Sequence, residues 1–111
     1  MNVDYISPQL DATFNALANS KRRGMVNTLA YRPATVSQLA DEFKLSLPAM
    51  HKHVKLLEQG KLIRRKKVGR VNFVALNHRA LSEAQAWINK YHTYWGSDDE
   101  TLENYIASMN S

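Results

Sequence analysis

Residues 46–76 read SLPAMHKHVKLLEQGKLIRRKKVGRVNFVAL, and in this stretch a helix pattern passes directly into a strand pattern. The first part has apolar residues at helical spacing, namely Leu47, Met50, Val54 and Leu57. Gly60 follows where such a helix would end. Two β-leaning runs then flank Val68-Gly69-Arg70, which is typical of a β-hairpin. The stretch therefore predicts a helix over about 47–59 and a hairpin over about 62–76.

Upstream of this stretch, capping signals predict three shorter helices. Ser7-Pro8 opens a helix over about 8–18, and Asn19-Ser20 recaps the chain for a second over about 21–31, which Pro33 stops. Thr35 and Gln38 form a capping box for a third helix that ends near Phe43.

The third predicted helix and the helix over about 47–59 are separated by only the turn Lys44-Leu45-Ser46. A short helix, a three-residue turn and a second helix follow the order of a helix-turn-helix motif. A basic hairpin directly after that motif is expected to form a wing.

Beyond Asn77, apolar residues return to helical spacing as far as Met109. Ser97 and Glu100 have capping-box spacing beside a gap at Gly96, so this region is either one kinked helix or two. One long helix over about 78–108 is the interpretation we favour. The expected fold class is then mainly α with a small β-hairpin (α+β), with five helices and a wing in a single domain over residues 1–111.

Length and composition narrow the classes of function. A chain of 111 residues buries a modest fraction of its surface, so self-association is expected. It has no cysteine, which excludes disulfides, cysteine-based zinc sites and thiol catalysis. No apolar run approaches the roughly 18–20 residues that span a bilayer, and MNVDYISPQL lacks the order of a signal peptide. We expect a cytoplasmic protein with no membrane partner.

The charge is regional. Residues 44–70 contain nine lysines and arginines but only one acidic residue, Glu58, whereas residues 97–111 contain four acidic residues and no base. A basic middle with an acidic tail is the pattern of a nucleic-acid binder, although a charged run can also be simply a solvated face.

The helix over about 47–59 has a polar side that fits a DNA major groove. Opposite its apolar residues lie Pro48, Lys52, Lys55 and Gln59, flanked by Ala49 and His51. Lys52 is expected to donate to a guanine edge, Ala49 to touch a thymine methyl group, and Lys55 to meet a phosphate. Ser46 has two interpretations, a plain helix cap or a phosphate contact, and both can hold.

The predicted hairpin carries five cations: Arg64, Arg65, Lys66, Lys67 and Arg70. Such residues either protect a sheet edge or lie along a DNA backbone. Because side chains alternate along a strand, only part of the set can face the duplex. Arg64, Lys66 and Arg70 are the expected DNA contacts, with Arg70 at the tip the strongest of them.

The stretch over 46–76, together with LANSKRRGMVNTLA (17–30) and ATVSQLADEF (34–43), resembles the ArsR-type winged helix-turn-helix repressors, in the branch that lacks a metal-binding cysteine motif. The resemblance implies a recognition helix in the major groove, a wing at the flanking minor groove, and a homodimer built by the first and last helices. It places Ser46, Ala49, His51, Lys52 and Arg70 near DNA. A small serine is usual where this chain has His51, so the base preference is expected to differ.

The histidines give little sign of a metal site. His51 and His53 diverge by about 200° on a helix, and His78 and His92 would stand about 21 Å apart on a continuous one. His53 falls on the flank of its helix, where it either packs against a local carbonyl group or contacts DNA. We expect no metal and no cofactor, and a metal site would need ligands from two chains.

Aromatic residues near the C-terminus exceed what a small winged domain buries, which points to an interface between subunits. Trp87, Tyr91, Trp95 and Leu102 share one face if the last helix is continuous. A ligand pocket among the aromatics is the alternative. The expected dimer interface consists of Leu10, Phe14, Leu17, Trp87, Tyr91, Trp95, Leu102 and Tyr105.

These features favour a homodimeric, sequence-specific DNA-binding repressor that reads an inverted-repeat operator in double-stranded DNA. A winged-helix module for protein–protein contacts, without specific DNA binding, is the alternative. An enzyme is not expected, because the sequence has no glycine-rich phosphate loop and no nucleophile motif.

Overall fold

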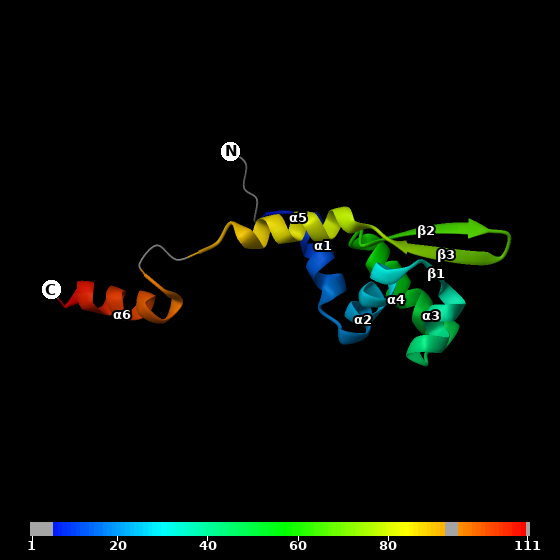
Figure 1. The fold of residues 1–111 in the computed structure, drawn as a ribbon, viewed down its shortest axis with the longest axis horizontal. Coiled ribbons are helices and arrows are strands. Elements are labelled where there is room, and N and C mark those ends of the chain that lie inside the picture. The colour runs from blue at the N-terminus through cyan, green and yellow to red at the C-terminus, as the bar shows by residue number, and fades with distance from the viewer. Residues whose placement is uncertain (1–5, 93–95, 111) are drawn as a thin grey trace.

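The computed structural model describes residues 6–92 and 96–110, which form helices and a small sheet (Figure 1). In chain order the elements are α1 (Pro8–Leu17), α2 (Ser20–Tyr31), β1 (Ala34–Thr35), α3 (Val36–Phe43), α4 (Leu47–Gln59), β2 (Ile63–Val68), β3 (Val71–Leu76), α5 (His78–Asn89) and α6 (Asp98–Met109). This is a winged helix-turn-helix fold of the α+β class, as the sequence predicted. None of the helices in the described ranges is long and apolar enough to cross a membrane.

Capping side chains begin the first four helices where the sequence predicted them. The side chains of Ser7, Asn19 and Ser46 each accept a hydrogen bond from a backbone N–H in the first turn of α1, α2 and α4. Thr35 and Gln38 form the complete capping box of α3. α3 ends at Lys44, whose left-handed backbone (φ 55°) turns the chain toward α4.

The sheet has the order β1-β3-β2 and is antiparallel throughout. β2 and β3 form the predicted hairpin, and their register pairs Arg65 with Val74 and Lys66 with Phe73. β1 was not predicted, because a strand of two residues is too short to show a period. It pairs Thr35 with Phe73, so the sheet joins the start of α3 to the wing.

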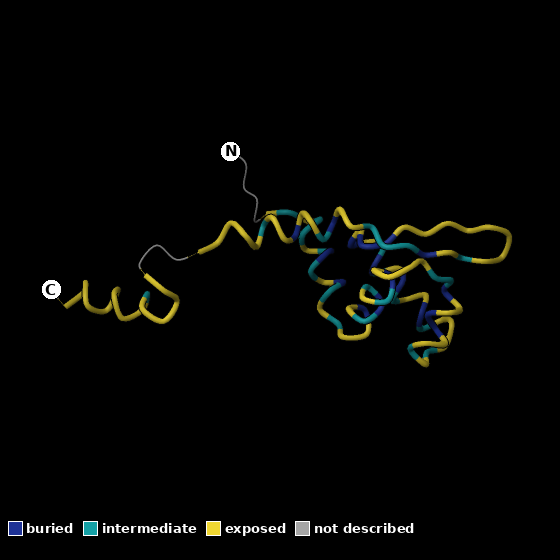
Figure 2. The backbone as a smooth tube through the Cα atoms, in the orientation of Figure 1, coloured by how far each residue is buried: buried dark blue, intermediate teal, exposed yellow. Residues whose placement is uncertain are grey.

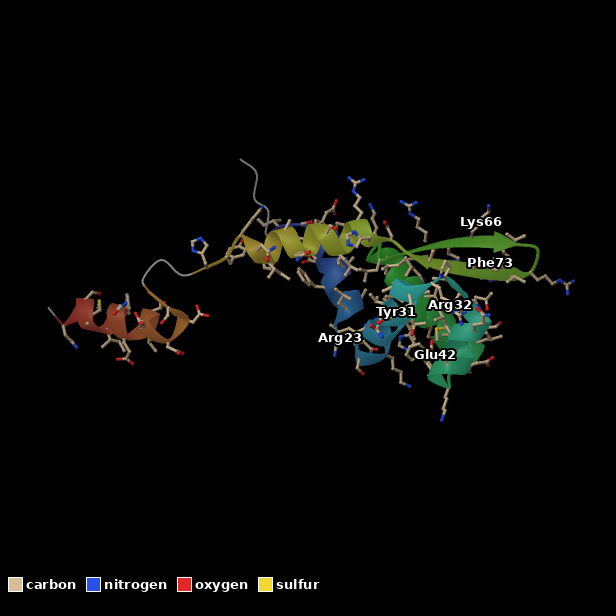
Figure 3. All side chains as sticks on the ribbon, in the orientation of Figure 1. Arg23, Tyr31, Arg32, Glu42, Lys66 and Phe73 are labelled. Carbon is tan, nitrogen blue, oxygen red and sulfur yellow. The ribbon has the colours of Figure 1, made fainter. Side chains whose placement is uncertain are left out.

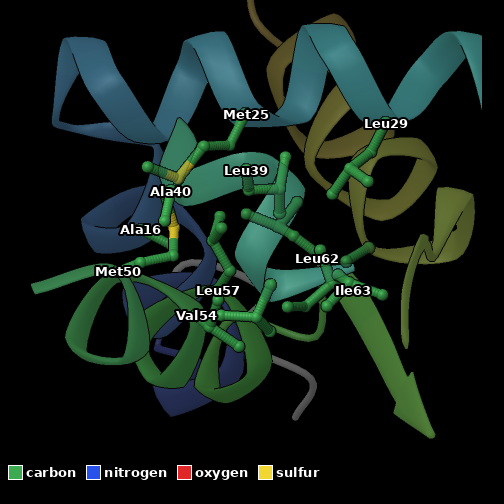
Figure 4. Close-up of a cluster of buried hydrophobic side chains, with 13 residues drawn as sticks. Ala16, Met25, Leu29, Leu39, Ala40, Met50, Val54, Leu57, Leu62 and Ile63 are labelled. Atoms are coloured by element: carbon green, nitrogen blue, oxygen red, sulfur yellow. The ribbon is translucent and has the colours of Figure 1, made fainter. Parts of the chain in front are cut away.

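The core lies between the helix-turn-helix and the inner face of the sheet (Figure 4). Met25 and Leu29 of α2, Val36, Leu39 and Ala40 of α3, and Met50, Val54 and Leu57 of α4 are buried there with Leu62, Ile63 and Val74. Leu47 departs from the prediction. It stands in the first turn of α4, beyond the edge of the core, and is 48% exposed.

α4 ends as predicted, but Gly60 has a different role from the one expected of a capping glycine. Its φ is −78°, and the left-handed residue is the next one, Lys61 (φ 54°). A Cβ at position 60 would lie 3.0 Å from the carbonyl oxygen of Ala12 and 3.0 Å from Cβ of Ala16. Glycine is therefore favoured at this position because α1 crosses α4 closely and an added Cβ would have to displace α1 slightly.

The prediction of one long C-terminal helix over about 78–108 is wrong, and so is the count of five helices. α5 ends at Asn89, and α6 begins at Asp98 after Gly96, whose φ of 112° no helix accommodates. Ser97 precedes α6, but its side chain makes no capping hydrogen bond. Trp87 and Leu102 consequently do not share one continuous helical face. Trp95, the residue expected between them, lies outside the described residues.

α6 lies apart from the other elements in Figure 1, and exposed residues run along almost its whole length in Figure 2. Its large apolar side chains are 44–69% exposed: Leu102, Tyr105, Ile106 and Met109. Asp98, Asp99 and Glu100 occupy its first turn, where negative charge is favoured by the helix dipole.

Candidate nucleic-acid interface

One side of α4 is free of core contacts and carries the predicted DNA-contacting residues. Met50, Val54 and Leu57 are buried, which turns the opposite side of the helix to solvent. Among the residues exposed on that side are Pro48, His51, Lys52, Lys55 and Gln59, and Ala49 is half-buried beside them. No carboxylate of the described residues pairs with Lys52 or Lys55. Both ammonium groups are therefore available to an external anion.

Ser46 acts as the cap of α4. Its Oγ accepts a hydrogen bond from the backbone N–H of Ala49 at 3.3 Å. The residue is exposed at the helix N-terminus. The capping prediction is confirmed, while contact of the same hydroxyl with a phosphate stays a prediction.

The recognition helix and the wing meet at a surface hollow of about 320 Å³. His51 and Leu47 line it from α4, and Arg70 and Asn72 line it from the hairpin. The start of α3 closes the hollow through Thr35, Val36 and Ser37. The structure thus brings together His51 and Arg70, which are predicted site residues from separate parts of the chain.

The register of the hairpin divides the five wing cations between two faces of the sheet. Arg65 is paired with buried Val74 and therefore points to the inner face, where its Nη2 lies 3.0 Å from Oε1 of Glu58 on α4. Lys67 shares that face by alternation. Arg64 and Lys66 lie on the outer face, Lys66 beside Phe73 (Figure 3).

The sequence could not show which wing cations lie on which face. Side chains alternate between the two faces of a strand, but the face of each residue is known only once one residue is known to be buried. Ile63 and Val74 supply that position in the structure. Lys67 and Asn72 are consequently placed on the side of α4, although neither was among the expected contacts. Arg64 and Lys66, which were expected contacts, stand on the opposite side of the sheet.

His53 contacts a side chain rather than the local carbonyl group that was expected. Its Nδ1 lies 3.4 Å from Nη1 of Arg22, a buried residue of α2. Burial lowers the pKa of His53 below its usual value, and the positive charges of Arg22 and Lys21 lower that pKa further. The imidazole is thus held neutral, and a neutral Nδ1 can accept the hydrogen bond from Arg22.

A second surface of interest lies where α5 crosses α1. The rings of Phe14 and Trp87 meet edge to face at 5.7 Å between centroids, and Tyr91 packs on Trp87 at 5.0 Å. Beside them is a groove of about 470 Å³ lined by Ile6, Leu10, Thr13, Ala80, Glu83, Trp87 and other residues of the two segments. The indole N–H of Trp87 is buried there with no acceptor among the described residues. Leu17 packs against the core from the end of α1.

The described residues contain no group of three or more side chains suited to hold a metal ion. His78 Nδ1 instead lies 3.1 Å from the hydroxyl of Ser82, one turn further along α5.

Comparison with known proteins agrees with this architecture. The helix-turn-helix domain family matches residues 17–66. The chain is similar to the HTH-type transcriptional regulator Rv2034 of Mycobacterium tuberculosis, with 30% identity over 80% of this chain and 81% of the relative. It is also similar to the transcriptional repressor SdpR of Bacillus subtilis, with 24% identity over 71% of this chain and 88% of the relative.

Among solved structures, the crystal structure of the ArsR family transcriptional regulator RHA00566 is 39% identical and superposes with a TM-score of 0.70 over 74% of this chain and 84% of that one. The fold and the exposed recognition helix define a winged helix-turn-helix transcriptional regulator. The chain belongs to the ArsR family of these regulators.

Proposed function

We propose that the protein is a homodimeric repressor that binds an inverted-repeat operator through α4 and the wing. The observation that carries this proposal is the meeting of α4 and the hairpin tip at one hollow, with His51 and Arg70 on its walls. An α-helix fits the major groove of B-DNA, and a wing beside it reaches the flanking backbone. No catalytic step is part of the proposal.

The two exposed lysines of α4 and the residue that caps the helix have proposed partners on the duplex. Lys52 is central on the solvent side and donates to a base edge, whereas Lys55 and the hydroxyl of Ser46 meet phosphates. Pro48, Ala49 and His51 line the contact at the start of the helix.

In the wing, Arg70 and Lys67 are the cations on the side of α4, and we assign the backbone contacts to them. Arg64 and Lys66 reach DNA only if the duplex wraps past the hairpin, because they lie on its outer face.

The proposed dimer forms around α1 and α5 and includes α6 of the partner. Leu10 and Trp87 line the groove at the α1–α5 crossing, Phe14 and Tyr91 pack on Trp87, and α6 offers Leu102 and Tyr105 without burying them in its own chain. The exposed apolar side chains of α6 fit the apolar part of such a groove. Two joined domains would read half-sites about one DNA turn, or a multiple of it, apart.

The outer face of the wing supports a second candidate function, a protein–protein module. Phe73 is 44% exposed there and lines a hollow of about 410 Å³ together with Pro33 and Ala75, and Val68 on the same face is 54% exposed. Apolar side chains on a sheet face are a common feature of protein interfaces.

Selection of bound fragments from a genomic library by the purified protein separates the two functions. If the protein is the proposed repressor, the bound fragments share an inverted repeat. Its affinity for these fragments exceeds its affinity for scrambled duplex and decreases steeply as the salt concentration rises. Enrichment without a common sequence, or equal affinity for both duplexes, would favour the protein–protein module.

A further inference from the structure

The guanidinium group of Arg22 is buried without a carboxylate partner among the described residues. Its Nε donates to the carbonyl oxygen of Ala16 at 2.8 Å, and its Nη2 donates to that of Asn15 at 3.1 Å. Both acceptors belong to the last turn of α1, where a helix leaves carbonyl groups unpaired and carries partial negative charge. Arg23 satisfies a third carbonyl, that of Leu17, at 2.8 Å. The C-terminus of α1 is therefore held by two arginines from the first turn of α2.

Arg22 differs from Arg23 because it also reaches α4. Its Nη1 lies 3.4 Å from Nδ1 of His53, which stands at the middle of that helix next to Lys52. Arg23 is exposed, and its guanidinium group donates to α1. The planar group of Arg22 thus links its own helix to two others, which the flexible point charge of a lysine does not reproduce.

A second contact joins α1 to the end of α4. The Oγ1 of buried Thr13 lies 2.9 Å from the carbonyl oxygen of Gly60 and 2.9 Å from that of Gln9 in its own helix, so its single proton donates to one of these two oxygens at a time. These two contacts, at separate points along α4, add to the core packing of that helix in fixing its direction and its rotation about its own axis. The Thr13 contact holds the end of the helix, and the His53 contact opposes rotation.

We propose that Arg22 is a positioning residue for DNA recognition: together with the buried core side chains of α4, its contact with His53 fixes the rotation of α4 relative to α1 and so the position of the exposed side chains of α4 in the groove. The inference rests on the proposed function, because α1 belongs to the proposed dimer interface. Rotation of α4 by one residue step would turn Lys52 about 100° away from a base edge. Because α1 belongs to the proposed dimer interface, the Arg22–His53 contact also affects the distance and orientation between the two recognition helices of the dimer.

The first test compares Arg22→Lys with Arg23→Lys as a matched control. We expect Arg22→Lys to lower the ratio of operator to scrambled-duplex affinity by about tenfold, because the substitution removes a charge-assisted hydrogen bond at a buried site. It should also bind operators whose half-sites are moved by one base pair nearly as well as the original. Arg23→Lys should retain the ratio and the spacing preference. Thermal melts and sedimentation velocity establish that both variants are folded and dimeric.

A second pair of variants acts at the acceptor. His53→Asn places a neutral oxygen near the position of Nδ1 and should retain the spacing preference, whereas His53→Leu removes the acceptor and should abolish that preference. Because His53 lies at a half-buried position, these variants keep the inference testable if Arg22→Lys does not fold.

The dependence of specificity on pH provides a readout that a purely structural role would not give. The charged groups that face His53 are Arg22 and Lys21, both from α2. Protonation of His53 therefore makes the imidazole a cation that these two positive side chains repel. The operator preference should therefore fall as the pH falls through the lowered pKa of His53 and recover at neutral pH. In His53→Asn the part of this fall that comes from His53 should be absent. His51 is retained in both proteins, so the difference between their two pH profiles reports His53 alone.

Equal loss of operator and scrambled-duplex affinity in Arg22→Lys, or an unchanged spacing preference in His53→Leu, would overturn the inference. Failure of the proposed function is distinct from both results, since the unmodified protein itself would then show no preference for an operator.

Discussion

At the scale of single residues, Gly60 shows that a glycine can be favoured by the close approach of a neighbouring helix instead of by its own backbone. In Gly60→Ala the added Cβ would press on the backbone of α1 at Ala12 and Thr13, 3.0 and 3.2 Å away, and backbone cannot step aside as a side chain can. We expect a loss of about 1–3 kcal/mol in the free energy of unfolding. Urea denaturation at a fixed protein concentration measures it, with exposed Glu42→Ala on α3 as a control that stays within about 0.5 kcal/mol. An unchanged free energy of unfolding in Gly60→Ala would mean that α1 can move away from α4 without loss of stability.

Lys52 and Lys55 stand one turn apart on the same exposed side of α4 but have different proposed partners. A base-edge contact is worth about 1–3 kcal/mol of discrimination, whereas a phosphate contact is shared by all sequences. Lys52→Ala should therefore weaken operator binding far more than binding to scrambled duplex, and Lys55→Ala should weaken both alike. Titrations of both duplexes at one salt concentration measure this, and equal weakening in Lys52→Ala would assign Lys52 to the DNA backbone.

At the scale of elements, the two faces of the hairpin lead to opposite expectations for two arginines. Removal of one cation–phosphate pair lowers the salt slope of log K by about 0.9 on B-DNA, and in a symmetric dimer each substitution removes two such pairs. Arg70→Ala should flatten the slope by up to about two, because Arg70 lines the hollow shared with α4. Arg64→Ala removes the same charge from the outer face and should change the slope little. Similar flattening by both variants would show that the duplex touches both sides of the wing.

The ends of most elements were predictable from sequence because capping is local chemistry. Ser7, Asn19, Thr35 and Ser46 each satisfy a backbone N–H within their own first turn, so a window of a few residues contains the whole signal. The break before α6 was missed for the converse reason. Helical spacing continues on both sides of it and favoured one helix over two, whereas in the structure α5 has ended at Asn89 and Gly96 has a positive φ.

The sequence could predict which side of α4 carries the candidate site. The apolar spacing of Met50, Val54 and Leu57 identifies the buried side of the helix, so the opposite side must face solvent. The contact between Arg22 and His53 was not predictable. It joins residues 31 positions apart, and no periodicity reports such a pairing. The arginines at 22 and 23 look alike in sequence, and only the packing of α1 against α2 buries the first and exposes the second.

At the scale of the whole molecule, α5 and α6 give the chain an extended shape, with principal dimensions of 71 × 33 × 23 Å. The long dimension arises because α6 lies beyond the end of α5 (Figure 1). An extended monomer with an exposed apolar helix is consistent with an arrangement completed by a second copy.

Tyr91 tests that arrangement, because it is 58% exposed in one chain and packs on Trp87 beside the groove. Truncation of an aromatic residue central to an interface costs about 2 kcal/mol or more in association, so Tyr91→Ala should populate monomer at micromolar concentration and bind a full operator little better than a half-site. Tyr31→Ala is the matched control, since Tyr31 is 84% exposed on α2, away from the groove. Sedimentation velocity distinguishes the two variants, and a dimeric Tyr91→Ala protein would move the interface elsewhere.

Thr35 takes part in two structures at once, as the last residue of β1 beside Phe73 and as the capping residue of α3. The wing and the helix-turn-helix are for this reason not interchangeable parts. A chimera that receives only a relative's hairpin over residues 63–76 would also replace the strand against which the α3 cap is aligned. Transfer of DNA preference between relatives by exchange of wings should therefore require residues 33–38 in the same graft, and hybrids without that segment should misplace the recognition helix even when both parents fold well.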